Sequence, residues 1–277
     1  MSTSFKGAYD KLKRAEEHKG DLEKTMKNFQ DKPGNRIHLG IKPDQRTKEL
    51  VLYVSNIPDL SEYLDRCSVL LGDLVQNLMS SLDHLAYQLL LLDSNGKPKR
   101  PNQIQFPICD TPEAFSAATK RRMGELSSET IEALEKFQPY HEFHRTHEHT
   151  WPPYHPLSIL RDLASKDKHR LPIDVRVPLN RIDAHKGPLP VMMFIFGIVQ
   201  QLIHQQANAF PAAKSGLELS RIGNTDTWKA DDMPRAAFLK PFVFIDGTHD
   251  ISDVSCEMIA VVEGIVSKFE EMYGTPN

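Results

Sequence analysis

The sequence predicts an α+β protein, a bundle of long helices with a small, mainly antiparallel β-sheet. Two observations carry this prediction. Apolar residues recur every three or four positions near both ends of the chain and through residues 62–92, which is the spacing of amphipathic helices. Short apolar runs at 37–54 and beyond residue 190 have the alternation or continuity of strands.

Composition and length indicate one globular chain. The 277 residues are 40% hydrophobic and 26% charged, and no repeat or low-complexity linker divides them. We therefore expect a single α+β domain over 1–277, with a helical core at about 1–170 and 250–274 and a sheet-rich part at about 171–249. The formal net charge of −3 argues against a general polyanion binder.

The chain is expected in the reducing cytoplasm. Its three cysteines lie far apart and form no CxxC pair. The first twenty residues lack the apolar core of a signal peptide, and the longest apolar run, 191–199, is about half the length that crosses a bilayer. No membrane partner is predicted.

The first elements are a helix and a hairpin. The helix ends before Pro33-Gly34, and its apolar stripe is Phe5, Ala8, Tyr9, Leu12, Ala15, Leu22, Met26 and Phe29. Two alternating runs follow, with Pro43-Asp44 between them, and predict the two strands of a β-hairpin: Ile37, Leu39 and Ile41, then Leu50, Leu52 and Val54.

The strongest helix is predicted from about Glu62 to Leu92. Ser94-Asn95-Gly96 ends it, and its stripe is Leu64, Cys67, Leu71, Leu74, Leu78, Leu82, Leu85, Leu89 and Leu92. Two shorter helices begin at the N-cap residues Thr111 and Ser127. A further helix is expected over Leu157–Lys168, before an extended run at Leu171–Val177.

Strand patterns dominate the next part of the chain. They lie at Val191–Phe196, Leu217–Ile222 and Phe242–Ile245, separated by Pro, Gly, Asn and Asp. The first of them runs into helix-like sequence, so Val191–Ala209 stays ambiguous between strand and helix. The last helix is clearer, with an apolar stripe from Ile251 to Met272 and Gly274 after it.

The long helix also carries an unusual polar face. Residues 67–96 contain no Lys, Arg or Glu, and the face opposite the leucines has Asp73, Gln76, Asn77, Ser80, Asp83, His84, Tyr87 and Gln88. Short polar groups on an apolar helix indicate burial against other elements, where each donor and acceptor needs a partner. One interpretation is a structural network; the other places Asp83 and His84 at a cleft.

A second group of charged residues lies at the end of the predicted 157–168 helix. It comprises Arg161, Asp162, Lys166, Asp167, Lys168, His169 and Arg170. A histidine can act as general base, and adjacent cations can stabilise a phosphate in RNA cleavage. Cations at a helix C-terminus also follow from the helix dipole alone.

Two further patterns suggest ligands. Candidate metal ligands crowd one segment: His141, His144, His147, His149 and His155. Their spacing falls short of HExxH, and nearby prolines favour a polar loop. Residues 97–122 hold six cations against two acids, which could contact a nucleic-acid backbone or form a solvated loop. The motifs GxGxxG, GxxxxGK[ST] and GxSxG are absent, and no cofactor is predicted.

Several blocks together resemble a family of uncharacterised bacterial proteins with the patterns GD..HNLRS.LDHL and L..L...DKHR. The blocks are 72–89, 106–108, 137–141, 155–171, 216–222 and the terminal helix. The arrangement is also distantly similar to HEPN domains, many of which are metal-independent RNases that act as dimers and carry an Arg, four to six residues, then His. Here seven residues separate Arg161 from His169, and the arginine of the family pattern is absent from the 72–89 block.

The resemblance implies a HEPN-like RNase or a nucleotide-binding component of a stress or phage-defence system, with RNA or nucleotide as ligand and a homodimer as the acting form. Its candidate catalytic residues are His169, Arg170, Lys168, Asp167, His84, Asp83 and Arg161. The first alternative is a non-catalytic helical interaction or ligand-binding protein with a buried Asp/His/Arg network. The second alternative is a metalloenzyme built on the histidine-rich segment.

Overall fold

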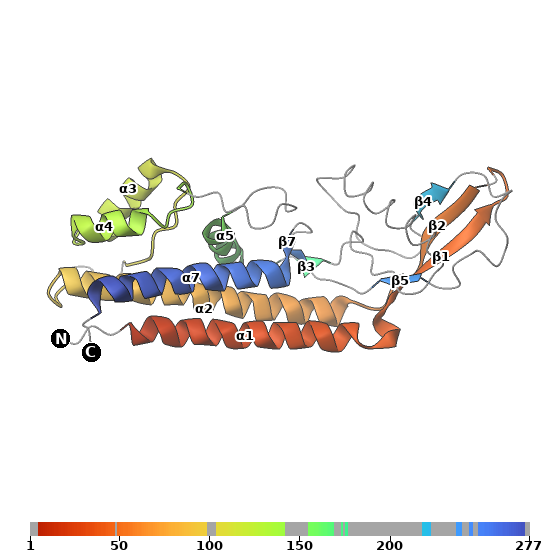
Figure 1. Ribbon diagram of the computed structural model, residues 1–277, viewed down its shortest axis with the longest axis horizontal. Helices are drawn as coiled ribbons and strands as arrows, with labels where there is room; N and C mark the ends of the chain where they lie inside the picture. Colours follow the sequence, from red (N-terminus) through yellow and green to blue (C-terminus); the bar gives the residue numbers. More distant parts are fainter. Residues whose placement is uncertain are drawn as a thin grey trace. The chain divides into compact units, whose positions relative to one another are not determined.

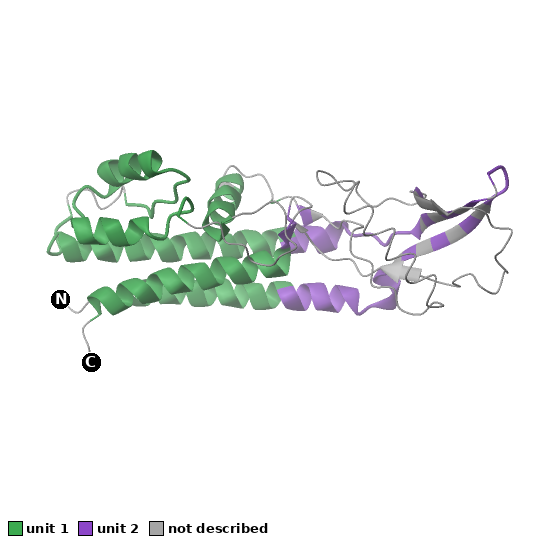
Figure 2. Cartoon of the chain, turned by 45° about the horizontal axis from the view of Figure 1, so that its top comes forward, with its two compact units in different colours: residues 1–22, 68–173, 251–277 green, residues 23–67, 174–250 purple. Residues whose placement is uncertain are grey.

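Two compact units make up the chain, which is seen here in a computed structural model (Figure 2). Unit 1 comprises residues 1–22, 68–173 and 251–277, and unit 2 comprises 23–67 and 174–250. The single-domain organisation stays a prediction. The structure describes residues 5–47, 49–98, 104–141, 155–168, 173, 175–176, 218–222, 237–239, 244–245 and 249–274.

Long helices build the core of unit 1. Helices α1 (Lys6–Gln30), α2 (Ser61–Asp93) and α7 (Ile251–Tyr273) run side by side there (Figure 1). Most residues of their apolar stripes are buried, and the largest fully buried side chains are Phe269 of α7, Leu22 of α1 and leucines of α2. The Ser81 hydroxyl donates to the Ala8 carbonyl at 2.8 Å, which ties α2 to α1. The three helices lie where the sequence predicts them.

The end of α2 is also as predicted. Asn95 and Gly96 have positive φ values of 53° and 78°, and the Gly96 amide donates to the Leu91 carbonyl at 2.7 Å. Left-handed residues and a six-to-one hydrogen bond of this kind form the Schellman motif, which commonly ends helices.

Shorter helices complete unit 1. Helix α3 (Pro112–Arg122) begins at Thr111, whose hydroxyl accepts from the Ala114 amide at 3.2 Å. Helix α4 (Ser128–Glu135) begins at Ser127, whose hydroxyl accepts from the Thr130 amide at 3.1 Å. Helix α5 (Pro156–Lys168) contacts α7. Both predicted N-caps are confirmed.

Unit 2 contains a β-hairpin and its neighbours. Strands β1 (Ile37–Asp44) and β2 (Glu49–Asn56) pair antiparallel, with β4 (Glu218–Ile222) beside β2 and β5 (Ala237–Leu239) beside β1. A second sheet joins β3 (Val175–Arg176), β6 (Phe244–Ile245) and β7 (His249–Asp250), again antiparallel. Strands β5 and β7 were not predicted, since three and two residues are too short to show a period.

Two sequence predictions about this unit need correction. Pro43 and Asp44 do not separate the strands: both belong to β1, opposite Leu50 and Glu49. The turn instead lies at residues 45–47, directly after Asp44. The Asp44 carboxylate accepts a hydrogen bond from the Arg46 amide at 2.9 Å, as in an Asx turn. The hairpin also groups with the later strands rather than with the helical core, because β2 and β1 pair with β4 and β5.

The coarse prediction of long helices with a smaller strand-bearing part is confirmed. The predicted strand at Val191–Phe196 and the ambiguous Val191–Ala209 stretch lie outside the described residues. Within the described part, no helix combines the length and apolar character required to span a bilayer.

Candidate functional site

Asp167 joins the end of α5 to the polar face of α2. Its Oδ2 accepts from the Gln76 side-chain amide at 2.7 Å. A Cβ at Gly72, one turn earlier on α2, would lie 3.1 Å from its Oδ1. The glycine therefore lets the carboxylate approach the helix backbone, and the predicted packing of these two segments is observed within unit 1. The partner is a neutral amide, whereas the sequence suggested a His or Arg.

Asp83 and His84 turn toward different neighbours. Asp83 Oδ1 accepts from the Phe106 amide at 2.9 Å. The exposed His84 imidazole lies against α1, where a Cβ on Gly7 would be 3.0 Å from its Nδ1. Adjacent helical residues are about 100° apart around the axis, which explains the divergence. These two side chains do not face one shared cleft.

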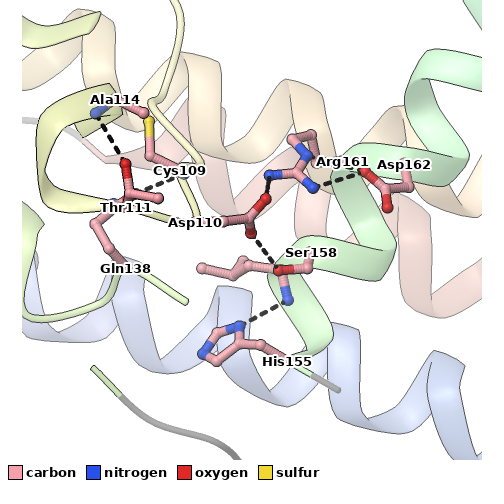
Figure 3. Close-up of polar contacts among 10 residues, drawn as sticks. Cys109, Asp110, Thr111, Ala114, Gln138, His155, Ser158, Arg161 and Asp162 are labelled. Atoms are coloured by element: carbon pink, nitrogen blue, oxygen red, sulfur yellow. Dashed lines mark hydrogen bonds and ion pairs between the residues drawn. The ribbon is translucent and has the colours of Figure 1, made fainter. Parts of the chain in front are cut away.

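Arg161 lies between two carboxylates (Figure 3). Its Nη1 is 2.6 Å from Asp110 Oδ2, and its Nη2 is 2.8 Å from Asp162 Oδ1. The Ser158 hydroxyl donates to the other Asp110 oxygen at 3.0 Å. Burial alone would lower the pKa of the guanidinium, but the hydrogen bonds to Asp110 and Asp162 outweigh it and raise that pKa. Arg161 is thus held as a charged crosslink between α5 and the segment before α3.

Gln138 anchors the same segment from the other side (Figure 3). Its Oε1 accepts from the Cys109 amide at 2.9 Å, and its Nε2 donates to the carbonyls of Pro107 at 3.0 Å and Leu134 at 3.1 Å. Only 1% of Gln138 is exposed. Burial raises the pKa of the neighbouring Cys109 thiol, an effect that Arg161 opposes. The segment from Phe106 to Asp110 is therefore held by side chains of α2 and α5 and by Gln138, which follows α4.

Asp110 and Gln138 were not predicted as members of the site. Neither has a pattern that marks it as a network member, because their partners are backbone groups and side chains distant in sequence. The short blocks 106–108 and 137–141 were noted, and these two residues lie beside or within them.

Two histidines of the candidate metal segment, His141 and His155, lie within the described residues, and each has its own neighbour. His155 is buried, and its Nδ1 accepts from the Leu157 amide at 3.1 Å, so it begins α5 as a cap. The His141 ring lies 4.5 Å from the Tyr140 ring. His144, His147 and His149 lie outside the described residues. Among the described residues, no group of three or more His, Cys, Asp or Glu could hold a metal ion.

The remaining candidate residues are only partly described. Lys168 ends α5, and His169 and Arg170 lie outside the described residues. In the cation-rich stretch, Lys120 and Arg121 are exposed in the last turn of α3, where cations complement the helix dipole. Lys99 and Arg100 are again outside the described residues.

Comparison with known proteins supplied no relative: no family model, no curated protein and no solved structure matches this chain.

Proposed function

We propose that this chain is a non-catalytic helical interaction protein, whose Asp/Arg/Gln network holds its helices in register. One observation carries the proposal: each described acid or arginine of the candidate catalytic set makes a structural contact. Asp83 binds the Phe106 amide, Asp167 binds Gln76, and Arg161 binds Asp110 and Asp162. Apart from the contact between the neighbours Arg161 and Asp162, they join residues 23 to 91 positions apart in sequence.

The arginine is the informative member of this set. A phosphate clamp needs a guanidinium whose donors can reach the phosphate oxygens. Arg161 already faces two carboxylates, so the three groups together carry a formal net charge of −1, which would repel a phosphate. Its side chain is only 33% exposed, against 56% for Asp110. This environment favours a crosslink over a substrate-binding group.

An interaction role also has support on the surface. Among the described residues, the exposed large hydrophobic side chains are Val69, Tyr87 and Met272, and the first two lie on α2. Val69 and Tyr87 lie in the part of α2, from residue 67 onward, that contains no Lys, Arg or Glu. Free thiols at all three cysteines are compatible with the proposed cytoplasmic location.

The test is an RNA cleavage assay. Purified full-length chain is incubated with total RNA in the presence of EDTA, beside His169→Ala and the matched control His18→Ala on α1. We expect no cleavage above a buffer blank from any of the three proteins. EDTA-resistant cleavage that persists in His18→Ala and disappears in His169→Ala would overturn the proposal.

That outcome would favour the second candidate, a HEPN-like, metal-independent RNase or nucleotide-binding protein of a defence system. Its support is the Asp167–Gln76 contact, because it brings the start of the Asp167–Arg170 block to the polar face of α2. In that case His169 would act as the general base, and Lys168 and Arg170 would bind the phosphate. Cleavage by this route leaves cyclic-phosphate ends.

A further inference from the structure

One outward stripe of α2, here called the α2 stripe, has the composition of an interface. It consists of Val69, Asp73, Asn77, Ser80, His84 and Tyr87. Their spacings of four, four, three, four and three residues keep them on one helix face, along about 27 Å of axis. Val69 is 55% exposed and Tyr87 36%, and Asp73 and His84 are also exposed.

The stripe differs from the solvent face of α1. That face carries long charged side chains in ion pairs, such as Lys6 with Asp10 and Arg14 with Glu17. The stripe has no Lys, Arg or Glu. Within the described part of the chain, the carboxylate of Asp73 and the imidazole of His84 have no hydrogen-bond or ion-pair partner. The described residues therefore supply no polar partner for these two side chains, although the polar composition of this face indicates that its groups need partners.

We propose that the α2 stripe binds the same stripe of a second copy of this chain, with the two helices antiparallel and a two-fold axis between Asn77 and Ser80. The proposal rests on the proposed interaction function and names its partner. In a two-fold interface the same patch serves both copies, so it must be complementary to itself.

The order of residues in the stripe meets this requirement. Asp73 lies four residues before Asn77, and His84 lies four residues after Ser80. Antiparallel pairing about the midpoint therefore places each Asp73 opposite the His84 of the other copy, twice per dimer. Asn77 then faces Ser80, two side chains that can exchange hydrogen bonds.

The ends of the stripe match as well. Val69 lies eight residues before Asn77, and Tyr87 lies seven residues after Ser80. In the antiparallel dimer, Val69 of one copy therefore lies opposite Tyr87 of the other, with an offset of one residue, about 1.5 Å along the helix axis. Each pair of apolar side chains covers the outer end of one Asp73–His84 pair. The short Asn77 and Ser80 at the centre allow helix axes to approach to about 8–10 Å.

The test is the oligomeric state of the full chain, measured by sedimentation equilibrium over a range of concentrations. His84→Asp would place two carboxylates opposite each other at two points, and we expect the dimer dissociation constant to rise by at least about tenfold. Asp73→Lys would weaken the dimer in the same direction. The double variant Asp73→Lys/His84→Asp restores opposite charges in this register only, and we expect a dissociation constant close to that of the wild type.

Glu16→Lys, an exposed site on α1 with the same charge change as Asp73→Lys, is the matched control and should leave the dimer unchanged. Thermal midpoints confirm that each variant is folded. A wild-type chain that stays monomeric up to about 1 mM overturns the inference, and so does a double variant no better than the singles. Neither result bears on the proposed non-catalytic role, which is tested separately by the RNA cleavage assay.

Discussion

Gln138 is the buried side chain on which several backbone groups around the 106–110 segment depend. Replacing it with alanine would leave the Cys109 amide and the Pro107 carbonyl without their partner in a site that is 1% exposed. We expect Gln138→Ala to lower the free energy of unfolding by about 2–3 kcal/mol, since buried groups lose their hydrogen bonds. Urea unfolding followed by circular dichroism measures this.

The control for that variant is Gln88→Ala, the same change at a partly exposed site on α2. It should stay within about 0.5 kcal/mol of the wild type. Equal effects of the two substitutions would contradict the role assigned to Gln138.

Gly72 and Gly264 form a second matched pair at the residue scale. Glycine to alanine inside a helix stabilises by about 0.5–1 kcal/mol when the new Cβ meets nothing. Gly264 on α7 has no neighbour within 4 Å of that position, whereas at Gly72 the Asp167 carboxylate would be 3.1 Å away. Gly264→Ala should therefore raise the thermal midpoint, and Gly72→Ala should not. A larger gain at Gly72 would show that Asp167 does not pack on α2.

At the scale of elements, the stability of helix α4 depends on its N-cap residue, Ser127. The Ser127 hydroxyl accepts from the Thr130 amide at 3.1 Å, and the Ser127 amide donates to Asp93 at 2.7 Å. Ser127→Ala removes the side-chain cap and the 2.8 Å contact between the Ser127 and Thr130 hydroxyls, and we expect it to lower the free energy of unfolding by about 1 kcal/mol. Ser128→Ala, one residue later and exposed, should change it by less than half as much in the same denaturant titration.

Sequence patterns alone are sufficient to predict some of the secondary-structure elements. Long apolar stripes predict α1, α2 and α7 because a helix of six or more turns repeats its period many times. The N-caps at Thr111 and Ser127 are predictable because capping is a local interaction. Strands β5 and β7 have only three and two residues, too few to show a period, and β5 also depends on a partner about 200 residues away, β1.

At the scale of the whole molecule, the cysteines can report on both units. Cys67 is in unit 2, Cys109 is in unit 1, both are buried, and Cys256 is exposed. Burial raises the pKa of Cys67 to about 12 and also raises that of Cys109, so both thiols stay protonated and unreactive near pH 8. We expect one thiol per native chain to react quickly with a disulfide reagent, and Cys256→Ser to abolish that reaction.

The same labelling tests the single-domain prediction. In the Cys256→Ser background, Cys67 and Cys109 should become reactive at the same urea concentration if the chain unfolds as one cooperative domain. We expect coincident transitions, because α1 and α2 each contribute residues to both units. Two separated transitions would show that the units unfold independently.

By itself the sequence determined the helices, the N-caps at Thr111 and Ser127 and the presence of the two hairpin strands, because these depend on period and on contacts within a few residues. It also indicated that the polar face of α2 and the Asp167–Arg170 segment carry candidate site residues. Only the tertiary structure decided that Asp83, His84 and Asp167 have separate neighbours, and that Arg161 lies between Asp110 and Asp162. The physical reason is that such contacts join residues up to 91 positions apart, and the distance between those residues is set by helix packing, on which local spacing carries no information.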